Sequence, residues 1–250
     1  MKDFISKKRI YSFAGILFLL IAWKIVSLYS GSEQIMPSPE AVFGQTFRIF
    51  GEAEFLKSLS ITLLRGLAGF FISVLLAALI GFPAGLHTEF FWFINPLLVS
   101  IRSTPVVALI LLAIIWFGNE MVPVFIAILT MFPIMCLNII EGLRQIDRDL
   151  VNMGLSYKIS RRRIITGIYI PSILPFLTGG ISSAMGFGWR AIIIGEVLSQ
   201  PAYGIGTRMQ EARSFLLVSE LIAWTLVAIM VSFLFEMLIR QVEKQYIRWR

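Results

Sequence analysis

Long apolar stretches separated by short polar segments dominate the chain. Each reaches about twenty residues, the length that an α-helix needs to cross a bilayer. The pattern predicts an all-α, polytopic membrane protein with about six transmembrane helices. The predicted spans are residues 10–29, 58–86, 91–117, 121–140, 171–199 and 216–239.

Two of these spans need comment. The first follows a charged N-terminal stretch, as in a secretory signal peptide, but its apolar run is long and lacks a small-residue cleavage site. We therefore expect it to be a retained helix. The third span contains Asn95-Pro96 and Thr104-Pro105. Because proline interrupts helical hydrogen bonding, this span forms either one kinked helix or two shorter ones.

Composition supports a lipid environment. Hydrophobic residues make up 57% of the 250 residues and charged residues 15%, against roughly 45–50% and 25% in soluble domains. The net charge of +7 would suggest nucleic acid in a soluble protein, but here the basic residues flank apolar blocks, so we expect no nucleic-acid partner. The single cysteine, Cys136, excludes an intrachain disulfide and a cysteine metal cluster.

The distribution of lysine and arginine predicts the orientation. If the N-terminus is cytoplasmic, the segments on the inside carry 14 of these residues and the segments on the outside carry 4. Positive charge is retained on the cytoplasmic side of membrane proteins. We therefore expect a multi-pass protein of the inner (cytoplasmic) membrane with both termini in the cytoplasm.

The segment 141–170 is the long polar connection between the fourth and fifth spans. Its apolar residues recur at helical spacing, which predicts two short amphipathic helices joined near residues 154–160. The arginines at 161–163 are expected to hold the next helix at the headgroup level. Pro171 and Pro175 are expected to open that helix. An ordered cytoplasmic segment with an apolar face is expected to dock against a partner.

This segment resembles the cytoplasmic loop of permease subunits of binding-protein-dependent ABC importers. The family pattern is Glu-Ala-Ala, a glycine four residues on, and Ile-x-Leu-Pro further along. The sequence Ile168-Tyr169-Ile170-Pro171 matches its end, and Gly154 takes the place of the second alanine. The chain departs from the pattern at Asn152, Met153 and Lys158, and the lysine replaces a glycine that would allow a sharp turn.

Other stretches resemble the nitrate/sulfonate/taurine branch of these permeases, from about residue 36 to the end. They include MPSPEAVF (36–43), INPLLVSIRSTPVVALILLAIIWFG (94–118) and GFGWRAIIIGEVLSQPAYGIGTRM (186–209). The branch also includes importers of thiamine-precursor pyrimidines, so the resemblance leaves the cargo open between a small anion and a small organic molecule.

The resemblance implies a single permease domain, residues 1–250, with a core at 56–240 and a cytoplasmic coupling loop at 141–170. It implies no catalysis and no cofactor on this chain, with ATP bound by a partner. The expected partners are a dimeric cytoplasmic ABC ATPase, an extracytoplasmic solute-binding protein, a second permease copy and membrane lipid. The residues expected to couple to the ATPase are Asn152, Met153, Gly154, Leu155, Ser156, Tyr157, Lys158, Ser160, Arg161 and Pro171.

Polar residues inside the predicted spans are candidates for the translocation path, because ionisable side chains are costly in lipid. Pairing of Arg190 with Glu196, across helices or across subunits, is an equally open structural alternative. Lys24, Arg65, Glu220 and Glu236 lie near span ends, so we expect them only to snorkel. The candidate path residues are Arg102, Ser103, Thr104, Arg190 and Glu196.

Small residues recur every four positions in two spans, at Gly81 and Gly85 and at Gly180, Ala184 and Gly188. We expect them to allow close helix packing inside the chain, with a dimer seam as the alternative. A different class of function also stays open. The chain is then a proton-coupled secondary carrier or a membrane-embedded enzyme that uses Glu196.

Overall fold

The computed structural model describes residues 2–246, and side chains within residues 10–241. All elements in the described part of the chain are helical. The elements are α1 (Lys2–Ser30), α2 (Pro39–Phe50), α3 (Ala53–Leu86), α4 (Thr88–Ser103), α5 (Val106–Phe117), α6 (Val122–Arg144), α7 (Arg148–Ser156), α8 (Arg161–Ile164), the π-helical turn η1 (Ile165–Tyr169), α9 (Ile170–Ser199), α10 (Ile205–Ser214) and α11 (Val218–Tyr246).

Five helices are long and apolar enough to cross a membrane, and a sixth span arises if α4 and α5 are counted together. This confirms the prediction of about six transmembrane helices. The pair α4 and α5 is bent by 97°. The break falls at Thr104-Pro105, whereas α4 continues through Pro96. Of the two proline sites in the third span, only the second ends a helix.

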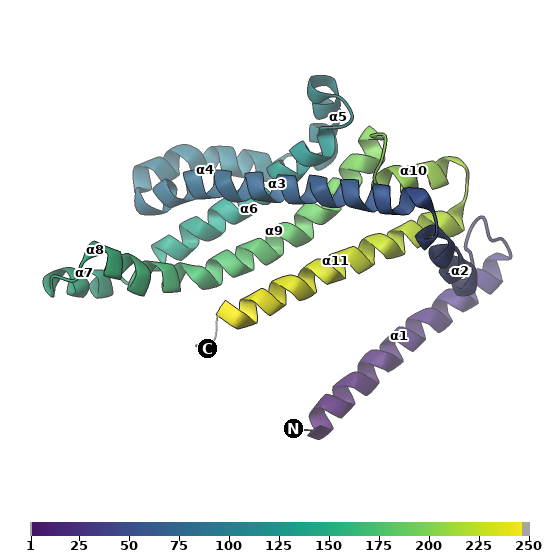
Figure 1. The fold of residues 1–250 in the computed structure, drawn as a ribbon, viewed down its shortest axis with the longest axis horizontal. Coiled ribbons are helices and arrows are strands. Elements are labelled where there is room, and N and C mark those ends of the chain that lie inside the picture. Colours follow the sequence, from purple (N-terminus) through teal and green to yellow (C-terminus); the bar gives the residue numbers. More distant parts are fainter. Residues whose placement is uncertain (1, 247–250) are drawn as a thin grey trace.

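Helix α6 is the centre of the bundle. It is the most buried of the candidate spans, and it packs between α3 and α9 in the main hydrophobic core (Figure 1). Close approach depends on glycine. A Cβ at Gly81 of α3 would lie 3.1 Å from Ile139, and one at Gly180 of α9 would lie 2.8 Å from Asn138. These small residues therefore pack inside the chain, as predicted.

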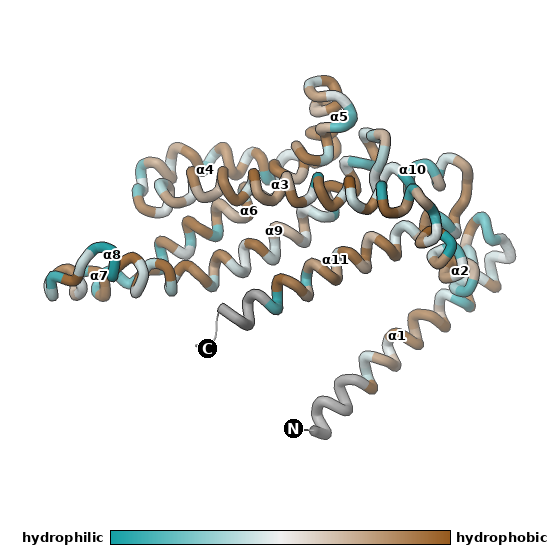
Figure 2. Tube along the Cα trace, in the orientation of Figure 1, coloured by the Kyte–Doolittle hydropathy of each residue, from teal (hydrophilic) through white to brown (hydrophobic). Residues whose placement is uncertain are grey.

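The bundle has two distinct ends, which we call the α7 end and the α10 end. Figure 1 shows α7, α8 and the short connection between α3 and α4 at the first, and α2 and α10 at the second. Hydrophobic residues colour most of the long helices, and hydrophilic residues gather at these two ends (Figure 2). This is the arrangement expected of a protein whose middle lies in lipid.

Helix α1 diverges from the bundle (Figure 1), and the apolar part of this helix has no buried residue. It is connected to the bundle by the segment that precedes α2 and by α2 itself. The Trp23 indole donates a hydrogen bond of 3.1 Å to the Pro37 carbonyl. Lys24, expected only to snorkel, forms a 2.9 Å ion pair with Glu40, and its hydrogen bond lowers the pKa of that exposed carboxyl.

Candidate translocation path and coupling segment

Helix α7 begins and ends with specific capping interactions. The Asp147 side chain accepts a 2.8 Å hydrogen bond from the Asp149 amide at the N-terminus. At the C-terminus, the Ile159 amide donates to the Gly154 carbonyl and the Lys158 amide donates to the Leu155 carbonyl, both at 2.9 Å. This pair of bonds is the Schellman motif, which stops a helix and turns the chain sharply.

Lys158 occupies the left-handed position of this motif, with a φ of +54°. Glycine is preferred there because a Cβ makes the left-handed conformation costly. The family pattern has glycine at this place. Lys158 therefore forms the sharp turn, with the backbone conformation that glycine would adopt.

The chain after this turn differs from the predicted second amphipathic helix. Helix α8 begins at Arg161 and continues through η1 into α9 without a break. The prolines were expected to open the fifth span, but Pro171 lies ten residues into this continuous segment. Its missing amide proton is accommodated next to a π-helical turn, in which the Ile170 amide donates to the Ile165 carbonyl. Such turns are a common way for a helix to absorb an irregularity.

One face of α7 and its turn is apolar and exposed. Gly154 is buried, and a Cβ there would lie 3.4 Å from Ile164 of α8, an ordinary van der Waals distance. Leu150 and Met153 lie three positions apart and therefore share one face of the helix, whereas Leu155 lines the cavity beneath α7. The exposed apolar side chains of the segment are Leu150, Met153, Leu155, Tyr157 and Ile159.

The break between α4 and α5 opens a groove of about 400 Å³ against α6. Arg102 and Thr104 line this groove together with Thr130 of α6 and Phe187 of α9. Pro105 cannot donate the next helical hydrogen bond, so the chain turns there. Ser103 is exposed at the same break. The structure thus brings Arg102 and Thr104 to one polar-edged groove.

Arg190 lies elsewhere. It lines a separate cavity of about 140 Å³ between α9 and α11, with Ser232 and Glu236. The alternative that Arg190 pairs with Glu196 is wrong for this structure. Glu196 is fully buried and accepts a 2.8 Å hydrogen bond from Arg65 of α3, which is itself only 8% exposed. Arg65 was expected only to snorkel, so this assignment is corrected.

Glu196 accepts bonds from two further groups. Thr62 Oγ1 lies 2.9 Å from its carboxylate and accepts a bond of the same length from the Ile205 amide. The Gly206 amide donates to the carboxylate at 3.0 Å. These amides belong to the first turn of α10, where free N–H groups and the helix dipole favour an anion. A Cβ on Gly204 would lie 2.5 Å from Glu196.

Arg65 extends this cluster to the loops at the α10 end. It donates to the Tyr203 carbonyl at 2.6 Å and pairs with the exposed Glu120 at 2.5 Å. Glu120 also accepts a 2.7 Å bond from the Ala202 amide. The cluster therefore joins α3, α9, α10 and the α5–α6 turn. Its donors and acceptors are matched, which is typical of a structural latch.

The sequence alone gave no signal for this latch. Glu196 stood out as an acid in an apolar stretch, but Arg65 lies 131 positions away along the chain, and no local spacing relates the two. The close packing of the Gly204-Ile205-Gly206 stretch against Glu196 was not predicted either, because it depends on the fold.

Comparisons with known proteins agree with this architecture. Residues 73–248 match the family described as binding-protein-dependent transport system inner membrane component. The chain is 30% identical to the putative aliphatic sulfonates transport permease protein SsuC of Escherichia coli (strain K12), over 92% of this chain and 88% of that protein.

The names of two further relatives refer to other transported solutes. The taurine transport system permease protein TauC of Escherichia coli (strain K12) is 24% identical, over 92% of this chain and 86% of that protein. The bicarbonate transport system permease protein CmpB of Synechococcus elongatus is 28% identical, over 84% of this chain and 79% of that protein. The chain belongs to the family of inner membrane components of binding-protein-dependent transport systems, and within it to the nitrate/sulfonate/taurine branch of ABC permeases.

Proposed function

We propose that this chain is the permease subunit of an ABC importer that moves a small solute with an anionic group, of the sulfonate, taurine or bicarbonate class, across the inner membrane. A separate ATPase supplies the energy, and a solute-binding protein delivers the cargo at the α10 end. The observation that carries the proposal is the exposed apolar face of α7, held on a capped turn at the opposite end of the bundle.

The geometry of α7 suits a mechanical link. Capping hydrogen bonds fix both of its ends, and the buried Gly154 lies against Ile164 of α8. Because α8, η1 and α9 form one continuous helix, a displacement of α7 is passed to a membrane-spanning helix. A packed helix pair moves as a body when a neighbouring subunit closes. In this proposal the α7 end is cytoplasmic.

The groove at the α4–α5 break supports the choice of an anionic cargo. Non-helical backbone at membrane depth is tolerated where it faces protein or a water-filled path. Arg102 and Thr104 line the groove and offer a positive charge and a hydroxyl. Two copies of the chain, with α5 projecting from each bundle (Figure 1), would place two such breaks along a shared path. Neither Arg190 nor Glu196 is needed there.

Co-purification tests the ATPase link. The variant Leu150→Asp/Met153→Asp places two charges on the exposed face of α7. It leaves the capping hydrogen bonds at both ends of the helix unchanged. With a tagged chain expressed beside the ATPase subunit, we expect the ATPase to be retained by the native chain and lost from this variant. Charge in the centre of an apolar interface typically costs several kcal/mol.

The control is Phe215→Asp, at a still more exposed apolar position between α10 and α11. It should retain the ATPase fully. Equal retention by the α7 variant and the control would overturn the proposal. The carrier or enzyme alternative predicts that even the native chain retains no ATPase, since a self-sufficient protein needs no partner at α7.

A further inference from the structure

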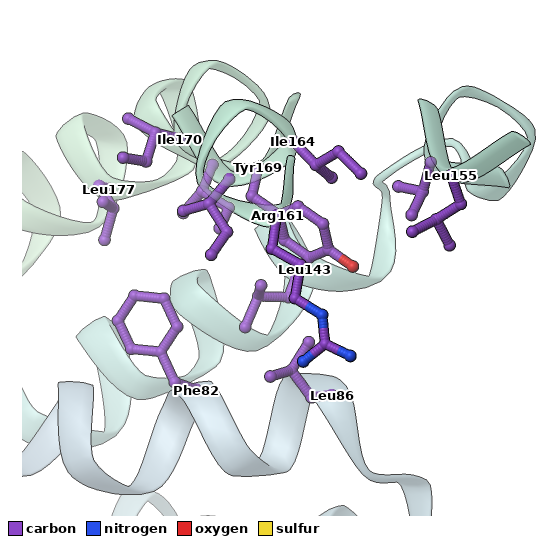
Figure 3. A pocket seen from close by; sticks show the side chains of 12 residues that line it. Phe82, Leu86, Leu143, Leu155, Arg161, Ile164, Tyr169, Ile170 and Leu177 are labelled. Carbon is purple, nitrogen blue, oxygen red and sulfur yellow. The ribbon is translucent and has the colours of Figure 1, made fainter. Parts of the chain in front are cut away.

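Two cavities adjoin at the α7 end, between the segment α7–η1 and the ends of α3 and α6. The first has a volume of about 540 Å³ and an almost wholly apolar lining (Figure 3). The second has a volume of about 530 Å³ and a mainly polar lining. They share four lining residues, so they adjoin along one wall, and we describe the two together as one amphipathic site. The shared residues are Leu86, Leu143, Val151 and Tyr169.

The apolar cavity reaches into the membrane-spanning helices. Phe82 lies one turn before the end of α3, and Leu177 lies two turns into α9. Figure 3 shows Phe82 on one side of the pocket and Leu177 and Ile170 on the other. Since a helix rises about 1.5 Å per residue, Leu177 is roughly 10 Å deeper than Ile170. A chain that fills this cavity therefore enters from the hydrocarbon side.

The charged residues that line the two cavities are all arginines. Arg161 lines the apolar cavity, and its guanidinium points toward Leu86 of α3 (Figure 3). Arg144 and Arg148 line the polar cavity, together with Thr88 and Asn152. Within the side chains that the structure describes, none of these three arginines forms an ion pair. Acidic residues Glu141, Asp147 and Asp149 lie nearby in sequence but line neither cavity.

We propose that this amphipathic site binds an anionic phospholipid, with one acyl chain between Phe82 and Leu177 and the phosphate at Arg144, Arg148 and Arg161. The cationic lining complements a negative headgroup, and the depth of the apolar cavity suits an acyl chain from the bilayer. The lipid would then fill the space beneath α7 and support it from the membrane side. A segment of a soluble partner would approach from the other side of α7.

Native mass spectrometry of the full chain tests the site. The protein is purified in detergent, equilibrated with equal amounts of phosphatidylglycerol and phosphatidylcholine, and released from the micelle. We expect retained phosphatidylglycerol in excess over phosphatidylcholine. The variant Arg148→Gln/Arg161→Gln should lose this preference by roughly fivefold per arginine, since each basic residue near an anionic lipid contributes about that factor.

The matched control is Arg162→Gln/Arg163→Gln, which removes the same charge from the same segment but lines neither cavity. It should keep the preference. A second variant, Leu177→Trp, fills the apolar cavity without changing charge and should lower total retained lipid. Equal loss in the two arginine variants would show a diffuse basic surface and overturn the site. Unchanged retention in Leu177→Trp, or displacement of lipid by the ATPase subunit, would also overturn it.

Discussion

At the scale of single residues, Lys158 and the Arg65–Glu196 pair each differ from what the sequence predicts for their positions. Lys158 holds the left-handed conformation that its family pattern assigns to glycine. Arg65 is drawn from the end of a span into a buried latch. In both cases the surrounding structure overrides the local preference of the residue.

Lys158→Gly is expected to stabilise the chain by about 1 kcal/mol, because glycine adopts a positive φ without the steric cost of a Cβ. The midpoint of thermal unfolding in detergent measures this. Lys158→Ala keeps the Cβ and removes the charge, so it should not raise the midpoint. If alanine stabilises as much as glycine, the gain comes from charge, and the assigned strain is wrong.

Arg65→Met should destabilise the chain by about 3–5 kcal/mol, because it leaves the buried Glu196 carboxylate without its ion-pair partner. Glu120→Gln should cost no more than about 1 kcal/mol, since Glu120 is solvent-exposed and its pair is screened. Chemical unfolding of both variants in detergent compares them. A double-mutant cycle with Glu196→Gln isolates the coupling, and a coupling near zero would show that no latch exists.

At the scale of elements, the sequence predicted the long helices well and the breaks poorly. Apolar length determines a span, so the six-span pattern followed from hydropathy. Thr104-Pro105 was one of two proline sites that the sequence marked as a possible break, but the bend of 97°, the π-helical turn before Pro171 and the short helices α2 and α10 did not follow from it. These depend on tertiary packing, as Pro96 and Pro105 show: both interrupt the same apolar stretch, yet one lies inside α4 and the other ends it.

The bend has a functional consequence if Arg102 faces the cargo. Arg102→Gln should lower the transport of an anionic cargo about tenfold, because a charge-assisted hydrogen bond contributes about 1.5–3 kcal/mol. Arg102→Lys keeps the charge and should retain most of the activity. Uptake of labelled cargo by membrane vesicles with the complete transporter measures both. Full activity in Arg102→Gln would remove Arg102 from the path.

At the scale of the whole molecule, the bundle separates the α7 end, which we propose for coupling, from the latched α10 end. Helices α6 and α9 connect the two (Figure 1), and the small residues on α3 and α9 let α6 pack closely between them. The separation was predictable because basic residues concentrate in the segments now found at the α7 end. The latch at the other end was not, because its partners are distant in sequence.

We expect the α7 end and the α10 end to lie on opposite sides of the membrane. In a Cys136→Ser background, which removes the chain's single, buried cysteine, a membrane-impermeant thiol reagent should label Phe215→Cys in intact cells. It should label Met153→Cys only after permeabilisation. The reverse pattern would invert the orientation, and labelling of both in intact cells would contradict the six-span topology.

The structure of the assembled transporter, determined by electron cryomicroscopy, would show directly whether α7 couples to the ATPase. We expect Leu150 and Met153 to lie in a groove of the ATPase subunit, with α7 held against α8 as it is here. A complex in which the ATPase docks elsewhere, while the apolar face of α7 contacts only solvent or lipid, would contradict it.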